Sequence, residues 1–299
     1  MKYELYSAMP TPMDHRGNLD EESLARMIVR NLKAGVTGFF SSGNMGEWSQ
    51  LPREMKVEIA AASRQMIGTA GALLAGVTET GLQETLDTMK AVVRRAAPDA
   101  VVVMLPPPAT CKIHPVTYLR SVLDAAECPV YYYHCPPVTG VQFHAGEFAR
   151  LLEHPRLAGI KNSAGDIGVR KELLKLKRDF DFRLFEGHEW GIDEALIAGC
   201  DGALCGLAAL AGKPMMEIVR AVERGDCRAA QEAQFKMLDI YHGIYGIDTA
   251  TVQNAHKYAL YKLGVFSTPR CRIVSNDSLS DARKAEIDAT LERFQADLA

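Results

Sequence analysis

The stretch Val130-Tyr131-Tyr132-Tyr133, with Leu157-Ala158-Gly159-Ile160 further along the chain, shows the pattern that decides the fold. Both are short, continuous apolar runs bounded by Gly, Pro or polar residues, which is typical of strands buried on both faces of a parallel sheet. Similar runs recur along the chain, at 5–8, 37–40, 72–75, 101–105, 183–185 and 202–205. The sequence therefore predicts about eight buried strands.

Segments with helical periodicity separate these runs. In two of them the apolar residues fall on one helical face, at positions 24, 27, 28 and 32 and at positions 82, 86, 89 and 93. Strand–helix alternation at about 20 to 36 residues per unit implies right-handed βαβ crossovers. About eight such units close as a barrel more readily than they form an open sheet, so we expect an α/β fold of the (β/α)8 TIM-barrel type.

The chain becomes all-helical from Pro214 onward. A last amphipathic helix, with Ser280 as its candidate N-cap, is indicated by apolar residues at 287, 291, 294 and 298. No linker rich in Ser, Gly or Pro sets this region apart. We therefore expect one structural domain, with a barrel core at 1–212 and, at 213–299, the last barrel helix plus a C-terminal helical extension packed on the barrel.

Composition excludes several classes of function. Apolar residues make up 47% and charged residues 24% of the 299 residues, as in ordinary globular proteins. The formal net charge of −3 gives no basic footprint for nucleic acid or an anionic membrane, and no apolar run reaches the roughly 18 to 20 residues that span a bilayer. Residues 1–5 lack the apolar core of a secretory signal, so we expect a cytoplasmic protein. The seven cysteines form no CxxC pair, which favours reduced thiols over disulfides or a zinc site.

Polar residues that end buried strands are candidates for chemistry, because barrel active sites gather at the C-terminal ends of the strands. Lys161 follows Ile160, where desolvation would lower its pKa from about 10.4 and leave a neutral, nucleophilic amine. The alternative is a lysine that extends to the surface as the loop begins. Tyr133 can shuttle protons, or it can be a packed aromatic residue. Alternation points Tyr131 and Tyr133 to one side of the strand and Tyr132 to the other.

Two loops after strands offer binding groups. Gly43 and Gly46 bracket a tight turn whose N–H groups can hold a carboxylate, while the Gly-Lys-Ser/Thr of a phosphate-binding loop is absent. After the seventh run, Gly187-His188-Glu189-Trp190 provides a base, an acid and an indole. His188 and Glu189 are also potential metal ligands, but no further clustered His, Cys or carboxylate completes such a site.

Taken together and in order, segments from Ser7 to about Leu263 resemble the dihydrodipicolinate synthase/N-acetylneuraminate lyase family of class I pyruvate-dependent aldolases. Gly43-Asn44-Met45-Gly46-Glu47 resembles the family's carboxylate-binding loop, G-[ST]-T-G-E. Tyr133-His134-Cys135-Pro136, followed by Thr139-Gly140, resembles its Y-[NH]-x-P…[ST]-G block. Ile160-Lys161-Asn162-Ser163 resembles the strand with the Schiff-base lysine. Because the spacing also fits, the joint match favours chemical roles for the lysine and the tyrosine.

The resemblance implies how these two residues act. Lys161 would form an imine with the 2-oxo group of a substrate, and Tyr133 would donate and accept protons. The protonated imine is an electron sink, so an adjacent C–C or C–X bond can break to give an enamine. Neither a metal nor an organic cofactor is needed. The resemblance also implies a small 2-oxo acid as partner and a homotetrameric assembly.

The substrate-binding residues implied by the resemblance depart in part from the family pattern. They are Gly43, Asn44, Met45, Gly206 and Leu204, the last of which resembles the apolar residue over the pyruvyl unit. His188, Glu189 and Trp190 are expected to bind the part of the substrate beyond the pyruvyl unit, because their loop opens on the same face as Lys161. The alternative is that Glu189 caps the following helix and Trp190 packs in its first turn. Asn44 and Met45 stand where the synthase has two hydroxyl residues, and its relay tyrosine is missing from 104–109. Sialic acid lyases carry an Asp-Glu pair where this chain has Glu189 and Trp190. Neither named activity fits well.

We therefore expect a Schiff-base-forming lyase, an aldolase or a dehydratase, that acts on a sugar-derived 2-oxo acid. Two alternatives remain open. One is a deaminase or hydratase that uses the same imine. The other is a barrel that binds a 2-oxo acid without turning it over, against which the presence of both Lys161 and Tyr133 argues.

Overall fold

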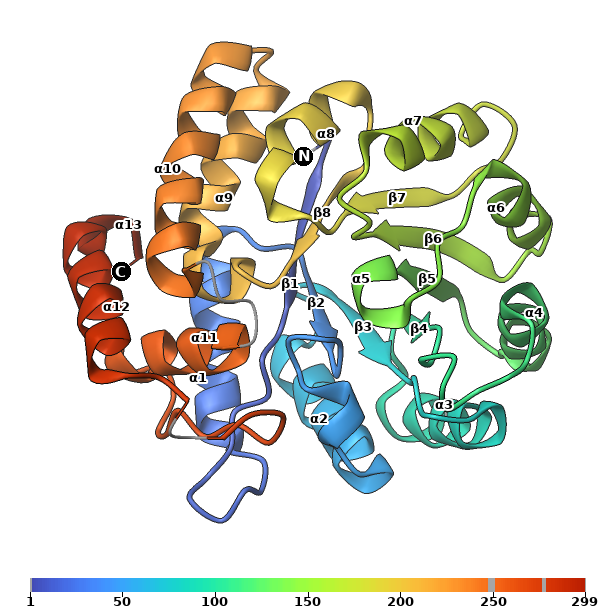
Figure 1. Ribbon diagram of the computed structural model, residues 1–299, viewed down its shortest axis with the longest axis horizontal. Coiled ribbons are helices and arrows are strands. Elements are labelled where there is room, and N and C mark those ends of the chain that lie inside the picture. The colour runs from blue at the N-terminus through green and yellow to red at the C-terminus, as the bar shows by residue number, and fades with distance from the viewer. Residues whose placement is uncertain (1, 247–250, 276–277, 299) are drawn as a thin grey trace.

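The computed structural model describes residues 2–246, 251–275 and 278–298, and it shows a closed barrel of eight parallel strands (Figure 1). Each strand pairs with the next along the chain, and β8 pairs with β1 to close the ring. The strands are β1 (Glu4–Ala8), β2 (Gly38–Ser41), β3 (Ala72–Gly76), β4 (Ala100–Met104), β5 (Val130–His134), β6 (Leu157–Asn162), β7 (Arg183–Glu186) and β8 (Gly202–Cys205). The predicted (β/α)8 barrel is confirmed.

Helices surround the barrel and connect its strands (Figure 1). They are α1 (Glu21–Ala34), α2 (Arg53–Ile67), α3 (Leu82–Ala96), α4 (Pro115–Ala125), α6 (Ala145–Leu152), α7 (Ile167–Leu176) and α8 (Ile192–Ala198), with α9 (Ala208–Glu223) after β8. Three short helical turns lie in the loops that follow β2, β5 and β7. These turns are η1 (Trp48–Gln50), α5 (Pro136–Thr139) and η2 (Glu189–Gly191).

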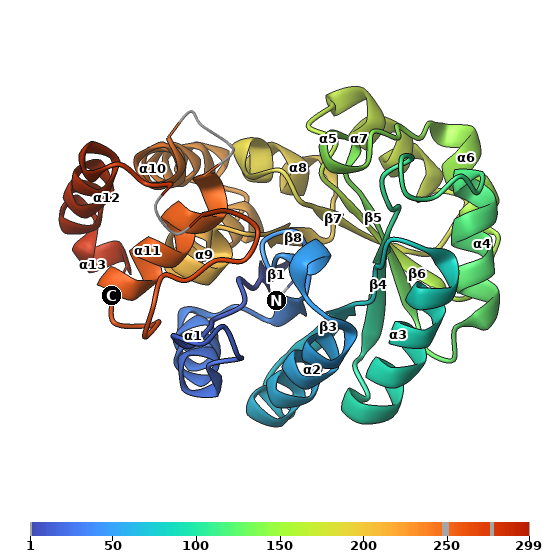
Figure 2. The same ribbon diagram turned by 60° about the horizontal axis from the view of Figure 1, so that its bottom comes forward.

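The C-terminal extension packs on one side of the barrel, as Figures 1 and 2 both show. It consists of α10 (Cys227–Tyr245), α11 (Val252–Lys262), α12 (Asp281–Arg293) and α13 (Gln295–Leu298). The expected boundary after residue 212 falls inside α9, which leaves helical geometry at Ala211, shortly before Pro214. One hydrophobic core continues from β1 and α1 through α9 and α10 to α12. In the described part of the chain, no helix is both long and apolar enough to cross a membrane.

Local sequence sets the ends of these helices. Asp20 caps α1 by accepting the N–H of Ser23 at 3.0 Å, and Gly35 ends the helix with a left-handed φ of 99°. Ser280 caps α12 through its hydroxyl, as predicted. The predicted last helix breaks at Phe294, so that α13 follows as a separate turn.

Alternating residues of the strands fill the barrel interior. An apolar cluster with buried residues from seven of the strands lies inside the ring and includes Tyr6, Phe40, Tyr133, Phe185 and Leu204. The strand boundaries differ from the predicted runs by at most two residues, and β8 matches its run. β6 continues to Asn162 because its last residues pair with both β5 and β7. Lys161 therefore lies within the strand and not in the loop after it.

Candidate active site

Lys161 lies near the C-terminal end of β6, and its side chain is buried, with 4% of the residue exposed. Its Nζ lies 4.0 Å from the ring centroid of Tyr133 on β5 and 5.3 Å from that of Phe40 on β2. Tyr133 and Lys161 are direct neighbours in the register of the two strands. The structure therefore brings the predicted lysine and tyrosine together, in the interior of the barrel.

Burial shifts the protonation of both groups. Desolvation lowers the pKa of Lys161 below its usual value, because removal from water penalises the ammonium form. A larger neutral fraction is then available to attack a carbonyl group at neutral pH. Desolvation also raises the pKa of Tyr133 well above its usual value, so the phenol keeps its proton and can donate it.

The three consecutive tyrosines of β5 divide as the alternation predicts. Tyr131 and Tyr133 belong to the cluster inside the barrel. Tyr132 lies on the outer side of the sheet, where its ring centroid is 5.4 Å from that of Phe143 and 6.4 Å from that of Phe148. Only the interior side, with Tyr131 and Tyr133, faces Lys161, so Tyr132 has a packing role.

The loop Gly43–Glu47, after β2, presents backbone N–H groups that the protein leaves available. The N–H groups of Asn44 and Met45 donate no hydrogen bond to any of the described residues. Gly43 packs directly on Phe40, since a Cβ at this position would lie 2.4 Å from the Phe40 ring. The same ring contacts Lys161, so these N–H groups belong to the neighbourhood of the amine. Such a loop suits a carboxylate.

Gly187, directly after β7, lies against the side chain of Lys161. A Cβ at this position would lie 2.7 Å from Cε of Lys161 and 2.1 Å from Oγ of Ser163. Glycine is therefore the residue that leaves room for the lysine. Leu204 on β8, predicted to cover the pyruvyl unit, is buried in the same interior cluster as Phe40 and Tyr133.

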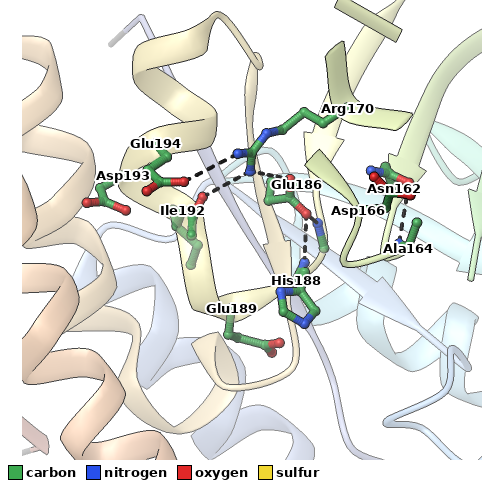
Figure 3. Close-up of polar contacts among 12 residues, drawn as sticks. Asn162, Ala164, Asp166, Arg170, Glu186, His188, Glu189, Ile192, Asp193 and Glu194 are labelled. Carbon is green, nitrogen blue, oxygen red and sulfur yellow. Dashed lines mark hydrogen bonds and ion pairs between the residues drawn. The ribbon is translucent and has the colours of Figure 1, made fainter. Parts of the chain in front are cut away.

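Glu186, the last residue of β7, was not singled out from the sequence, yet it organises the loop that follows (Figure 3). Its Oε1 accepts the N–H groups of Gly187 at 3.1 Å and His188 at 3.0 Å, and its Oε2 pairs with Nη1 of Arg170 at 3.2 Å. Desolvation raises the pKa of this carboxyl, while the two N–H groups and Arg170 oppose the shift. The available signal was a carboxylate that ends a buried strand, the same signal that identified Lys161.

Glu189 directs its carboxylate to the loop after β8. Its Oε1 accepts the N–H groups of Gly206 at 3.0 Å and Leu207 at 3.3 Å, and its backbone carbonyl accepts from Nε2 of Gln234 at 2.8 Å. Gly206 in turn lies against Met45, because a Cβ there would be 2.6 Å from Cγ of Met45. Three predicted binding residues therefore meet, from the loops after β2, β7 and β8.

His188 and Trp190 take different directions from Glu189. The His188 ring lies beside Gly165, where a Cβ would be 3.4 Å from the imidazole, and it lines a cavity of about 160 Å³ between the loops after β6 and β7. The Trp190 residue is 51% exposed, and its ring packs on that of His242, 4.9 Å between centroids. Of the three residues on this loop, His188 and Trp190 line the same cavity, whereas Glu189 reaches the loop after β8.

The chain is similar to known proteins along most of its length. A model of the dihydrodipicolinate synthetase family matches residues 2–293. The N-acetylneuraminate lyase of Salmonella paratyphi B is 28% identical over 275 residues, which cover 89% of this chain and 88% of that protein. The 4-hydroxy-tetrahydrodipicolinate synthase of Methanospirillum hungatei is 26% identical over 246 residues, which cover 81% and 83%. The solved structure of YagE, a prophage protein of the dihydrodipicolinic acid synthase family from E. coli K12 in complex with pyruvate, has the same fold, with a TM-score of 0.86, 23% identity and 99% of both chains covered. The chain therefore belongs to the dihydrodipicolinate synthetase family and is a lyase of that type.

Proposed function

We propose that this protein is an aldolase or a dehydratase that acts on a sugar-derived 2-oxo acid through an imine on Lys161. The observation that carries the proposal is the buried amine of Lys161, 4.0 Å from the ring centroid of Tyr133. The available N–H groups of Asn44 and Met45 lie beside the same Phe40 ring and suit the substrate carboxylate. The pyruvate bound to YagE is a ligand of the expected class.

The proposed steps use only groups of this chain and the substrate. The neutral amine of Lys161 attacks C2 of the 2-oxo acid, and the carbinolamine loses water with a proton from Tyr133. In the aldolase reaction the C4 hydroxyl gives its proton to the Tyr133 phenolate left by the loss of water, the C3–C4 bond breaks and its electron pair moves into the protonated imine. An aldehyde leaves and an enamine remains. Protonation of the enamine at C3 and hydrolysis release pyruvate and the free lysine, with no metal or organic cofactor.

The part of the substrate beyond the pyruvyl unit is proposed to contact the loop His188–Trp190 and Gly206. Supporting this, the carboxylate of Glu189 bridges the loop after β7 to the N–H group of Gly206 at 3.0 Å. Met45 fills the space over Gly206 that a larger residue there would need. A crowded pocket of this kind favours a short polyol-like tail over a long sugar.

Borohydride trapping tests the central step. Incubation with pyruvate and borohydride, followed by intact mass measurement, is expected to add one reduced pyruvyl group to the native protein and none to Lys161→Ala. Peptide mapping should place the adduct at Lys161. An adduct of equal yield on the Lys161→Ala variant would show that another amine reacts and would refute the proposal.

The products separate this reaction from its alternatives. An aldolase releases pyruvate and an aldehyde from a hydroxylated 2-oxo acid, and a dehydratase releases water without shortening the chain. Release of ammonia would instead indicate an imine-based deaminase. An adduct without turnover of any 2-oxo acid in a panel would indicate a protein that only binds.

We also propose that the protein acts as a homo-oligomer, with a tetramer as the form that the family resemblance implies. Large apolar side chains are exposed on neighbouring elements, namely Trp190 of η2, Ile197 of α8 and Phe235 of α10. The helix α10 contacts both η2 and α8. Grouped apolar side chains of this kind often mark an interface between proteins, and a second copy of the chain would cover them.

A further inference from the structure

We infer that Glu47 and Lys257 are positioning residues, through which the C-terminal extension holds the loop Gly43–Glu47 in the conformation that binds the substrate carboxylate. This role rests on the function proposed above, in which that loop contacts the carboxylate. Lys257 belongs to α11, outside the strand–helix units of the barrel. The substrate site would then depend on a helix that contributes no group to the substrate itself.

The side chains of Glu47 and Lys257 form an ion pair that is fully buried. Nζ of Lys257 donates to Oε1 of Glu47 and to the carbonyl oxygen of Arg270, at 2.8 Å from the latter. The other carboxylate oxygen of Glu47 accepts the N–H groups of Arg272 and Ile273, the second at 2.7 Å. Both oxygens of the carboxylate are therefore bound by α11 and the segment that follows it.

The loop is held from two sides. On the side of the barrel, Oγ1 of Thr11 donates to the carbonyl oxygen of Gly46 at 2.9 Å. On the other side, Glu47 has a left-handed φ of 63°, a conformation that costs energy for a residue with a Cβ. The ion pair and the two N–H groups retain Glu47 in this conformation. Without them the backbone would relax, and the N–H groups of Asn44 and Met45 would change direction.

The effect of such a change should be confined to carboxylate binding. The loop touches Phe40 through Gly43, and Nζ of Lys161 lies 5.3 Å from the centroid of the same ring. Lys161 itself is oriented by β6 and by its neighbour Tyr133 on β5. A shifted loop therefore leaves the amine in place and able to react.

Charge is not the least costly way to fill this space. Replacing a buried ion pair by apolar residues of similar volume is often neutral or stabilising, whereas removing one partner is strongly destabilising because a buried charge is left unpaired. Apolar side chains at 47 and 257 would not accept the N–H groups of Arg272 and Ile273. The ion pair thus holds the loop in one conformation, and that conformation sets the direction of the N–H groups of Asn44 and Met45.

A pair of ligands that differ in the carboxylate tests this role. Methyl pyruvate keeps the 2-oxo group of pyruvate but lacks the negative charge. For each ligand, the half-saturation concentration for borohydride trapping at Lys161 is measured on the native protein and on the double variant Glu47→Gln/Lys257→Met, which leaves no unpaired charge buried. The matched control is Lys177→Met, which breaks the ion pair of Lys177 with Asp201 near the start of β8. Circular dichroism and thermal unfolding check that every variant is folded.

In the double variant, the half-saturation concentration for pyruvate is expected to rise by about tenfold or more, since small misplacements of binding groups have effects of this size. That for methyl pyruvate should change by less than about twofold, and the control should resemble the native protein with both ligands. If the double variant does not fold, Glu47→Gln alone is used, because glutamine keeps the shape and an oxygen acceptor. The same difference between pyruvate and methyl pyruvate is then expected.

Other results would refute the role. An equal rise of the half-saturation concentration for both ligands in a folded variant would mean that the pair only supports the fold. Native half-saturation concentrations for both ligands would mean that the loop needs no such support. A native protein that forms no adduct with either ligand would instead contradict the proposed function, on which this role rests.

Discussion

Single residues of β5 show how one strand supplies both a chemical group and a packing group. Tyr133 faces Lys161 in the barrel interior, whereas Tyr132 faces the helices. The hydroxyl groups of these two tyrosines have different surroundings and different expected roles. The hydroxyl of Tyr132 is buried without a hydrogen-bond partner among the described residues. The hydroxyl of Tyr133 is the proposed proton donor and acceptor.

Phenylalanine substitutions separate these two roles. Tyr133→Phe is expected to lower kcat by about 10² or more, the usual effect of losing a general acid–base group. Tyr132→Phe should leave kcat within about threefold, because it removes an unsatisfied polar group, a change that is often neutral for stability. Steady-state kinetics of both variants, with thermal unfolding as the check on folding, provide the measurement. A larger loss of kcat in Tyr132→Phe would reverse the assignment.

At the scale of elements, the strands were predictable because each is a continuous apolar run between polar or Gly-rich segments. Their exact ends were not, since these depend on pairing with neighbours distant in sequence. β6 extends to Asn162 because that residue pairs with His134 and with Glu186. Alternation within a run was enough to divide Tyr132 from Tyr133.

The loops were less predictable than the strands, because side-chain direction in a loop follows from tertiary contacts. The sequence grouped His188, Glu189 and Trp190, but only Glu189 reaches the loop after β8. Trp190 instead packs on His242 of α10, a contact that no motif or spacing in the sequence indicated. The glycine at 187 was visible in the sequence, but its contact with Lys161 required the structure.

The loop after β7 offers a prediction about specificity. Oε1 of Glu189 accepts two N–H groups of the next loop, while its second oxygen has no hydrogen bond or ion pair among the described residues. Glu189→Gln keeps an oxygen for the N–H groups and removes the charge. If the carboxylate reads hydroxyl groups of the substrate tail, the relative kcat/KM across a panel of 2-oxo acids with different tails should change by about tenfold or more.

Glu189→Ala is the companion variant, because it removes the bridge between the loops as well as the charge. It should lower kcat/KM for every member of the panel. Equal kcat/KM ratios across the panel in native protein and Glu189→Gln, with pyruvate trapping intact, would show that Glu189 only supports the loop. Specificity would then have to come from other residues near Lys161.

At the scale of the molecule, the ion pair of Glu47 and Lys257 marks the limit of sequence reasoning. The partners are 210 positions apart, and Lys257 lies in a helix whose apolar pattern gives no reason to single out one lysine. Glu47 was visible as part of the loop motif, but the motif carries no information about what holds it. The C-terminal extension was predicted to pack on the barrel, and only the structure shows that it reaches the loop after β2.

The assembly provides the last prediction, because the neighbouring helices α8 and α10 both expose a large apolar side chain. Ile197 is 49% and Phe235 is 58% exposed. Burying a side chain of this type in an interface contributes about 1.5 to 3 kcal/mol to the free energy of association. A charged side chain in its place would lose its water there and would oppose association. Sedimentation should therefore find the native protein as an oligomer. The Phe235→Asp oligomer should dissociate at protein concentrations about tenfold or more above those at which the native oligomer dissociates.

Val29→Asp is the matched control, since Val29 of α1 is 48% exposed on a different helix. A native protein that sediments as a monomer would contradict the proposed assembly. Dissociation by Val29→Asp alone, with the variant still folded, would place the interface on α1, because a new charge weakens association most where the contact would bury it.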